Sequence, residues 1–311
     1  MPARLNNAAI SFLHRFKHTG DLSDISAAIA VQQRAVQLTP DGHEGMPLGL
    51  SNLGNALQAR FGWTGDLTDL SKAISSLQHA IHLTPTSHAA LPLRLSGLGT
   101  LFLDRYKQTG DFSDLSEAIS CHQHAVQLAP PGHAHLPGLL HNLGNSLRSR
   151  FERTGDLSDV LEAISVGQRV VQLTPYDQPD MPSLLGNLGT SFQRRFQRTG
   201  DLSDISEAIS AQQRAVQLTP DTHVDMAAWL NNLGNAFQFR FKRTGDLSDL
   251  SSAISSHQRA VQLTPDGHAD MPKRLSNLGN SLQYRFERTG DLSDILEAVS
   301  AHQRIGKRNR H

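Results

Sequence analysis

Apolar residues follow a helical spacing twice within a unit of 45 residues, as residues 46–90 illustrate. The first stripe predicts a helix of about four turns and lies at Leu50, Leu53, Leu57 and Phe61. The second stripe predicts another helix and lies at Leu70, Ile74, Leu77 and Ile81. No segment alternates with the period of a strand. Each unit is therefore expected to be a pair of helices.

Turn-forming residues separate the two predicted helices. Thr64-Gly65-Asp66 breaks the first stripe, and glycine is free to adopt a positive φ there. Asp66 or Thr68 is placed to accept a backbone N–H of the second helix. Pro85 disfavours the helical conformation of the residue before it, so the second helix should end near Thr84.

The unit is repeated almost seven times with a constant period. A Leu-Gly pair marks it at Leu53-Gly54, Leu98-Gly99, Leu143-Gly144, Leu188-Gly189, Leu233-Gly234 and Leu278-Gly279. A helix pair of this size cannot bury its apolar face alone, so neighbouring units must stack. We expect an all-α solenoid of about seven antiparallel helix pairs, forming one repeat domain over residues 1–305, with units of about 1–45, 46–90, 91–135, 136–180, 181–225, 226–270 and 271–305.

The unit resembles the tetratricopeptide repeat. The signature positions of that family match Leu50, Leu53, Gly54, Leu57, Ala73, Ala80 and Pro85, with extra residues in or beside the turns. The long repeats are similar to those of kinesin light chains, and even closer to arrays of fungal proteins that precede caspase-like (CHAT) or nucleotide-switch domains. The resemblance implies a right-handed superhelix whose first helices line a concave groove. The aromatic residue that the family carries in the second helix is replaced by Gln32, Leu77, His122, Gly167, Gln212, His257 and His302.

Composition narrows the classes of partner. Lys plus Arg equal Asp plus Glu at 29 each, so the chain lacks the positive charge that drives binding to nucleic acid or anionic lipid. The basic tail, residues 306–311, is interpreted as a solvated end. Cys121 is the only cysteine, which favours a reducing compartment, and no signal core or membrane-spanning stretch occurs. The cytoplasm is therefore the expected location.

The resemblance directs attention to polar residues of the first helices as a peptide-binding surface. Asparagine carries both a donor and an acceptor, so a row of them can pair with the main chain of an extended peptide. One row consists of Asn52, Asn142, Asn187, Asn232 and Asn277, and a second lies three residues further on at Asn55, Asn145, Asn235 and Asn280. Residues that differ between units would select the peptide: Arg194, Phe239, Lys273 and Tyr284. The other interpretation is that the amides bond only to adjacent helices.

Three other sets of residues are interpreted as structural. The repeated arginines, such as Arg60, and the repeated aspartates, such as Asp66, are expected to form an ion pair or a cap near the turn. The histidine that recurs between units, such as His88, is expected to pack or cap its loop, because single histidines 45 residues apart do not make a metal site. Cys121 with His124 is a weak signal for a nucleophile, since no orienting group or oxyanion loop accompanies it.

The sequence predicts a non-catalytic scaffold without cofactor or metal that binds a protein or peptide along an asparagine-lined groove. Nucleic acid and membrane are not expected partners. Met1-Pro2 is in register with Met46-Pro47, and no polar capping unit occurs at either end, so self-association through uncapped ends is also expected. The alternative is that the chain is a fragment, serving as the sensor or oligomerisation arm of a larger CHAT-protease or nucleotide-switch protein.

Overall fold

The computed structural model describes residues 1–130 and 132–308, with side chains described as far as residue 304. This part of the chain consists of helices, turns and loops, without strands. The first helix of each unit is α1 (Pro2–Thr19), α3 (Met46–Thr64), α5 (Leu91–Thr109), α7 (Leu136–Thr154), α9 (Met181–Thr199), α11 (Met226–Thr244) and α13 (Met271–Thr289). The second is α2 (Leu22–Gln37), α4 (Leu67–His82), α6 (Phe112–Leu128), α8 (Leu157–Leu173), α10 (Leu202–Leu218), α12 (Leu247–Gln262) and α14 (Leu292–Arg308).

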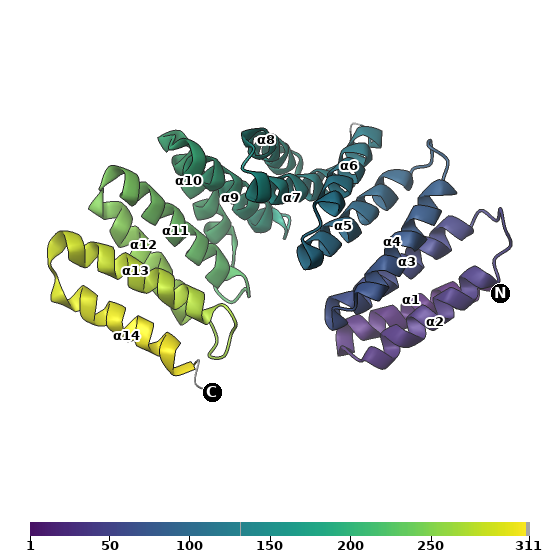
Figure 1. Ribbon diagram of the computed structural model, residues 1–311, viewed down its shortest axis with the longest axis horizontal. Coiled ribbons are helices and arrows are strands. Elements are labelled where there is room, and N and C mark those ends of the chain that lie inside the picture. The colour runs from purple at the N-terminus through teal and green to yellow at the C-terminus, as the bar shows by residue number, and fades with distance from the viewer. Residues whose placement is uncertain (131, 309–311) are drawn as a thin grey trace. The chain divides into compact units, whose positions relative to one another are not determined.

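The helices fall into two compact parts, residues 1–153 and 154–311. The first and second helices of a unit are called A and B helices below. In both parts A helices pack on their own B helices, as in α3 with α4 and α11 with α12, and B helices pack on the next A helix, as in α10 with α11 (Figure 1). The predicted all-helical array of stacked pairs is thus confirmed. One continuous domain over residues 1–305 remains a prediction, and residues 309–311 of the basic tail lie outside the described residues.

The turn between A and B helices forms as its residues predict. Gly65 has a φ of 70°, and its amide donates to Phe61 O at 2.8 Å, which closes α3. Asp66 then caps α4 by accepting the Thr68 amide at 2.8 Å. This hydrogen bond lowers the pKa of the Asp66 carboxyl.

Within each part the core continues from one helix pair to the next. Ala73 and Ala80 are fully buried, so their small side chains allow α4 to lie close to its neighbours. Apolar residues of four successive helices, α11 to α14, form one cluster that includes Phe241, Leu250 and Leu275. Stacking of this kind buries the face that an isolated helix pair would expose to water.

The Leu-Gly pair has a steric role that its periodicity does not reveal. A Cβ atom on Gly234 would lie 2.4 Å from the His257 ring, and one on Gly99 would lie 2.7 Å from the His122 ring. Both rings are buried, at 0% and 1% exposure, where aromatic residues are expected in the family. The glycine therefore makes room on the A helix for the imidazole of the B helix.

Replacing Gly234 by Ala should lower the free energy of unfolding by about 1–3 kcal/mol, because the added methyl group would force the buried ring of His257 to shift. Gly62→Ala is the matched control, since that helical glycine has nothing within 4 Å of an added Cβ and should gain about 0.5–1 kcal/mol. Urea unfolding of both variants measures the difference. Equal effects at the two positions would contradict the steric role.

Candidate functional site

The first row of asparagines lies on the A helices, and several of its members bond to the preceding A helix. Asn52 Nδ2 donates to Asn6 Oδ1 at 2.8 Å, and Asn277 Nδ2 donates to Asn231 Oδ1 at 2.9 Å. Asn142 Nδ2 donates to Ser96 Oγ at 3.0 Å. The amides thus hold neighbouring A helices together, as the second interpretation of the row expects. Each of these bonds uses one N–H of a side chain that has two N–H groups and a carbonyl.

The second row is more accessible. Asn55 and Asn280 are exposed, whereas Asn145 and Asn235 are half-buried. Asn145 Oδ1 accepts from Arg148 Nη2 at 2.8 Å. Two residues of the first row, Asn187 and Asn232, are also half-buried. Within each part, consecutive A helices contact one another, as α1 does α3 and α11 does α13. The asparagines of the two rows are together called the asparagine face.

Two of the residues expected to select a peptide come together through a lysine that the sequence analysis missed. Lys242 Nζ lies 6.0 Å from the centroid of the Phe239 ring and 4.6 Å from that of Tyr284. The Tyr284 ring in turn lies 6.4 Å from Phe241. This cluster joins α11 to α13 at their last turns, and the three-residue step from Phe239 to Lys242 was the available signal.

The other two predicted selectivity residues are placed differently. Arg194 is half-buried on α9, and its Nη1 donates to Gln197 Oε1 at 3.3 Å. Lys273 is exposed in the first turn of α13. The structure therefore does not gather the four residues at one point.

The repeated arginine forms a structural ion pair with an aspartate that the sequence analysis did not single out. Arg60 donates through Nε and Nη2 to the two carboxylate oxygens of Asp69, both at 2.6 Å. The Asp69 carboxylate is buried at 2% exposure, and its bond to Arg60 raises the pKa of the guanidinium. Asp66, the aspartate that was noted, serves as the cap instead. Both structural roles are thus confirmed, but different aspartates carry them.

The histidine between units caps its own loop. His88 Nδ1 accepts the amide of Ala90 at 3.1 Å, and His268 Nδ1 accepts that of Asp270 at 3.1 Å. The same bond starts the A helix in other units, which confirms the predicted capping role. Cys121 is buried, and desolvation raises the pKa of its thiol to about 11, so the thiolate is disfavoured at neutral pH.

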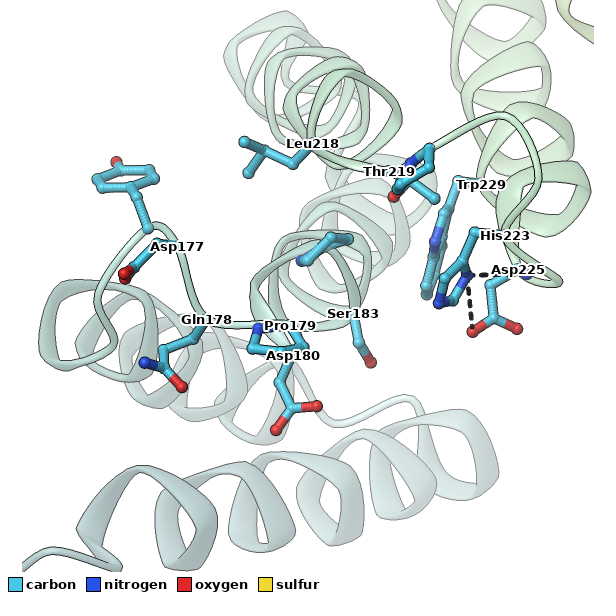
Figure 2. A pocket seen from close by; sticks show the side chains of 13 residues that line it. Asp177, Gln178, Pro179, Asp180, Ser183, Leu218, Thr219, His223, Asp225 and Trp229 are labelled. Carbon is cyan, nitrogen blue, oxygen red and sulfur yellow. Dashed lines mark hydrogen bonds and ion pairs between the residues drawn. The ribbon is translucent and has the colours of Figure 1, made fainter.

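A pocket of about 690 Å³ opens where α9, α10 and α11 meet. It is called the junction pocket and is lined by Tyr176, Asp177, Gln178, Pro179, Asp180, Pro182, Ser183, Leu218, Thr219, Pro220, His223, Asp225 and Trp229. Figure 2 shows Trp229 and His223 facing Gln178, Asp180 and Ser183 across it. Three carboxylates and no lysine or arginine line it, so its interior attracts cations.

Trp229 packs against α9 and forms one wall of this pocket. A Cβ on Gly186 would lie 2.5 Å from the indole, so the missing side chain of Gly186 lets the ring lie against α9. Tyr176 also lines the pocket and stacks on Arg214, whose Cζ is 5.0 Å from the ring centroid. The sequence signal was the single tryptophan at a register position that other units fill with arginine, leucine or glycine.

The stacked helix pairs define a class by fold, the α-solenoids built from repeated helix pairs. The tetratricopeptide-repeat family profile matches residues 138–180, within the fourth unit. That unit thus matches the tetratricopeptide repeat, and the other units repeat its helix pair. A comparison with curated proteins gave no match.

Solved structures share the fold at low sequence identity. BtubC (BKLC) from P. vanneervenii is 18% identical, with a TM-score of 0.56, over 82% of this chain and 92% of that one. A putative kinesin light chain from Podosopora anserina, with nearly identical TPR-like repeats, is 15% identical, with a TM-score of 0.50, over 69% and 97% of the two chains. No helix in the described part of the chain is long and apolar enough to cross a membrane.

Proposed function

We propose that the chain is a non-catalytic scaffold that binds an extended peptide or a partner helix along its asparagine face. The observation that carries this proposal is the recurrence of carboxamides on consecutive A helices, with Asn55 and Asn280 exposed. A carboxamide pairs with the main chain of a peptide whatever its side chains are, so the row suits an elongated ligand. Phe239, Lys242 and Tyr284 add an aromatic and cationic patch beside it, which favours particular ligand residues.

Replacing Asn187 and Asn232 together by Ala should weaken peptide binding by about tenfold or more, because two main-chain partners are lost. A displayed random peptide library selects ligands on the native chain, and the Kd of the selected peptides is then measured on both variants. Gln168→Ala with Gln213→Ala is the matched control, since these carboxamides are exposed on the B helices. Unchanged affinity in the asparagine variant would remove the asparagine face from the proposal.

A second candidate is that the array is an arm that associates through its last helix, as in a larger signalling protein with a CHAT or nucleotide-switch domain. The favouring observation is the apolar surface of α14. Val299 is 46% exposed, whereas its equivalents in earlier units, Ile209 and Ile254, are 4% and 3% exposed because the next A helix covers them. A second copy of the chain would cover Val299 in the same way.

A further inference from the structure

Two other units of this chain have an arginine side chain at the position that corresponds to the junction pocket. Arg94 and Arg274 occupy the A-helix position of Trp229, 135 residues before and 45 residues after it. Arg94 Nη1 donates to Thr84 Oγ1 at 2.7 Å. Arg274 Nη1 donates to Thr264 Oγ1, and Arg274 Nη2 donates to Asp270 Oδ2 at 3.3 Å. In both units a guanidinium is thus bound between the end of a B helix and the start of the next A helix.

The junction pocket retains the two groups that hold Arg274. Thr219 and Asp225 lie 45 residues before Thr264 and Asp270, and both line the pocket. Thr219 is 6% exposed, and its hydroxyl donates to Ala215 O at 2.7 Å, so its lone pairs are the remaining hydrogen-bonding capacity. Within the described residues no side chain donates to it, because Trp229 stands where the arginine would be. The buried Thr219 hydroxyl therefore lacks the guanidinium donor that its equivalents Thr84 and Thr264 have.

Other residues that line the junction pocket also favour the binding of a guanidinium. Asp177 and Asp180 bring two further carboxylates to the lining, which contains no lysine or arginine. Its one basic side chain, His223, has Nδ1 at 3.8 Å from Asp225 Oδ2. The Trp229 indole offers an aromatic face on which a planar cation stacks. Arginine matches this set better than lysine, since its fork of N–H groups can reach a hydroxyl and a carboxylate together while its plane lies on a ring.

We propose that the junction pocket binds an arginine side chain of a partner protein, in the place that this chain's own Arg94 and Arg274 occupy in their units. The proposal rests on the proposed function as a protein-binding scaffold and identifies the chemistry of one partner residue. The pocket then acts as a specificity-determining site beside the sequence-tolerant asparagine face.

A second pocket of the same chain provides a natural control. It lies at the equivalent place between α1, α2 and α3, has a volume of about 260 Å³, and is lined by Thr39, His43 and Gly49 among others. Gly49 stands at the position of Trp229 and Gly45 at that of Asp225, so its lining contains neither an aromatic wall equivalent to Trp229 nor a carboxylate. The proposal assigns arginine binding to the junction pocket alone.

The test titrates the full chain with acetyl-Gly-Arg-Gly-amide and with the same tripeptide carrying citrulline or lysine, and follows the two indole N–H signals by NMR. The chain contains two tryptophans, so Trp63→Phe assigns the signals and Trp63 serves as an internal reference. The arginine peptide should shift the Trp229 signal, and citrulline, which is uncharged and of similar shape, should bind at least about tenfold more weakly. An equal response to citrulline or to lysine would overturn the assignment to a guanidinium.

Variants locate the bound side chain. Trp229→Arg should fill the pocket from within, as Arg274 does in its unit, and the variant chain should bind the arginine peptide at least about tenfold more weakly while staying folded by circular dichroism. Because that variant removes the reporter, its binding is measured by the signals of the Thr219 and Asp225 amides. Asp225→Asn should weaken binding about fivefold with the indole retained. The Asn187→Ala, Asn232→Ala chain should bind the tripeptide unchanged, so failure of the asparagine face and failure of the pocket are distinguished. Undiminished binding to Trp229→Arg would refute the proposal.

Discussion

Acidifying the protein from pH 7 to pH 4 should lower its free energy of unfolding by about 3 kcal/mol for each of two buried histidines, His122 and His257. Desolvation lowers the pKa of each imidazole from 6.5 to about 4. Between pH 4 and pH 6.5 each imidazole binds a proton in the unfolded chain but stays neutral in the folded chain. The stability that the neutral histidines contribute is therefore fully present above pH 6.5 and declines as the pH falls toward 4. Urea unfolding at half-unit pH steps measures it.

The chain itself supplies the control for this prediction. His122 Nδ1 lies 2.9 Å from Ser146 Oγ and His257 Nδ1 lies 3.1 Å from Ser281 Oγ, each serine being in the next A helix. Elsewhere Gln212 takes the histidine position and Ala236 the serine position. His257→Gln with Ser281→Ala copies that pair and should remove about half of the pH dependence. A slope that stays unchanged would show that other groups are responsible.

The caps respond to acid in a separate range. Hydrogen bonds from backbone amides lower the pKa of Asp66, Asp111, Asp201, Asp246 and Asp291. Their stabilising effect is present above the ordinary carboxyl pKa and is lost as the pH falls through the lowered values. The histidine effect is therefore separated from that of the caps above about pH 4.

The helix pairs were predictable from the sequence because their signals are local. The stripe from Leu50 to Phe61, the glycine of positive φ at Gly65 and the cap at Asp66 lie within one unit and act through neighbours along the chain. The 45-residue period then predicted that neighbouring helix pairs stack, because one pair cannot bury its apolar face alone. No knowledge of how the helices cross was needed for any of these conclusions.

The contacts between helices were not predictable in the same way. Gly234 and His257 are 23 residues apart, and only the crossing of α11 and α12 brings them together. The choice between Asp66 and Asp69 as the partner of an arginine likewise depends on which carboxylate faces α3. The junction pocket was the hardest to foresee, because its evidence is a substitution at Trp229 that has meaning only once Arg274 is seen to bind Thr264.

Replacing Arg240 by Ala should lower the free energy of unfolding by about 3 kcal/mol or more, because the Asp249 carboxylate, which is 4% exposed in the native chain, would lose its partner. In the native chain Arg240 Nε and Nη2 donate to the two Asp249 oxygens at 2.8 and 2.6 Å. The Arg240 guanidinium also lies 5.8 Å from the Phe237 ring centroid, so packing is lost as well. Chemical denaturation gives the change.

The matched control is Arg243→Ala, since Arg243 is exposed on the same helix and should contribute less than about 0.5 kcal/mol. Asp249→Leu combined with Arg240→Met removes both charges and should cost less than Arg240→Ala alone, because no carboxylate is then left buried and unpaired. Hydrogen exchange adds a spatial test. In a linear array the loss falls on the damaged pair, so amides of α11 and α12 should exchange faster while those of α1 to α4 do not change. Uniformly faster exchange along the chain would instead require cooperative unfolding of all the pairs.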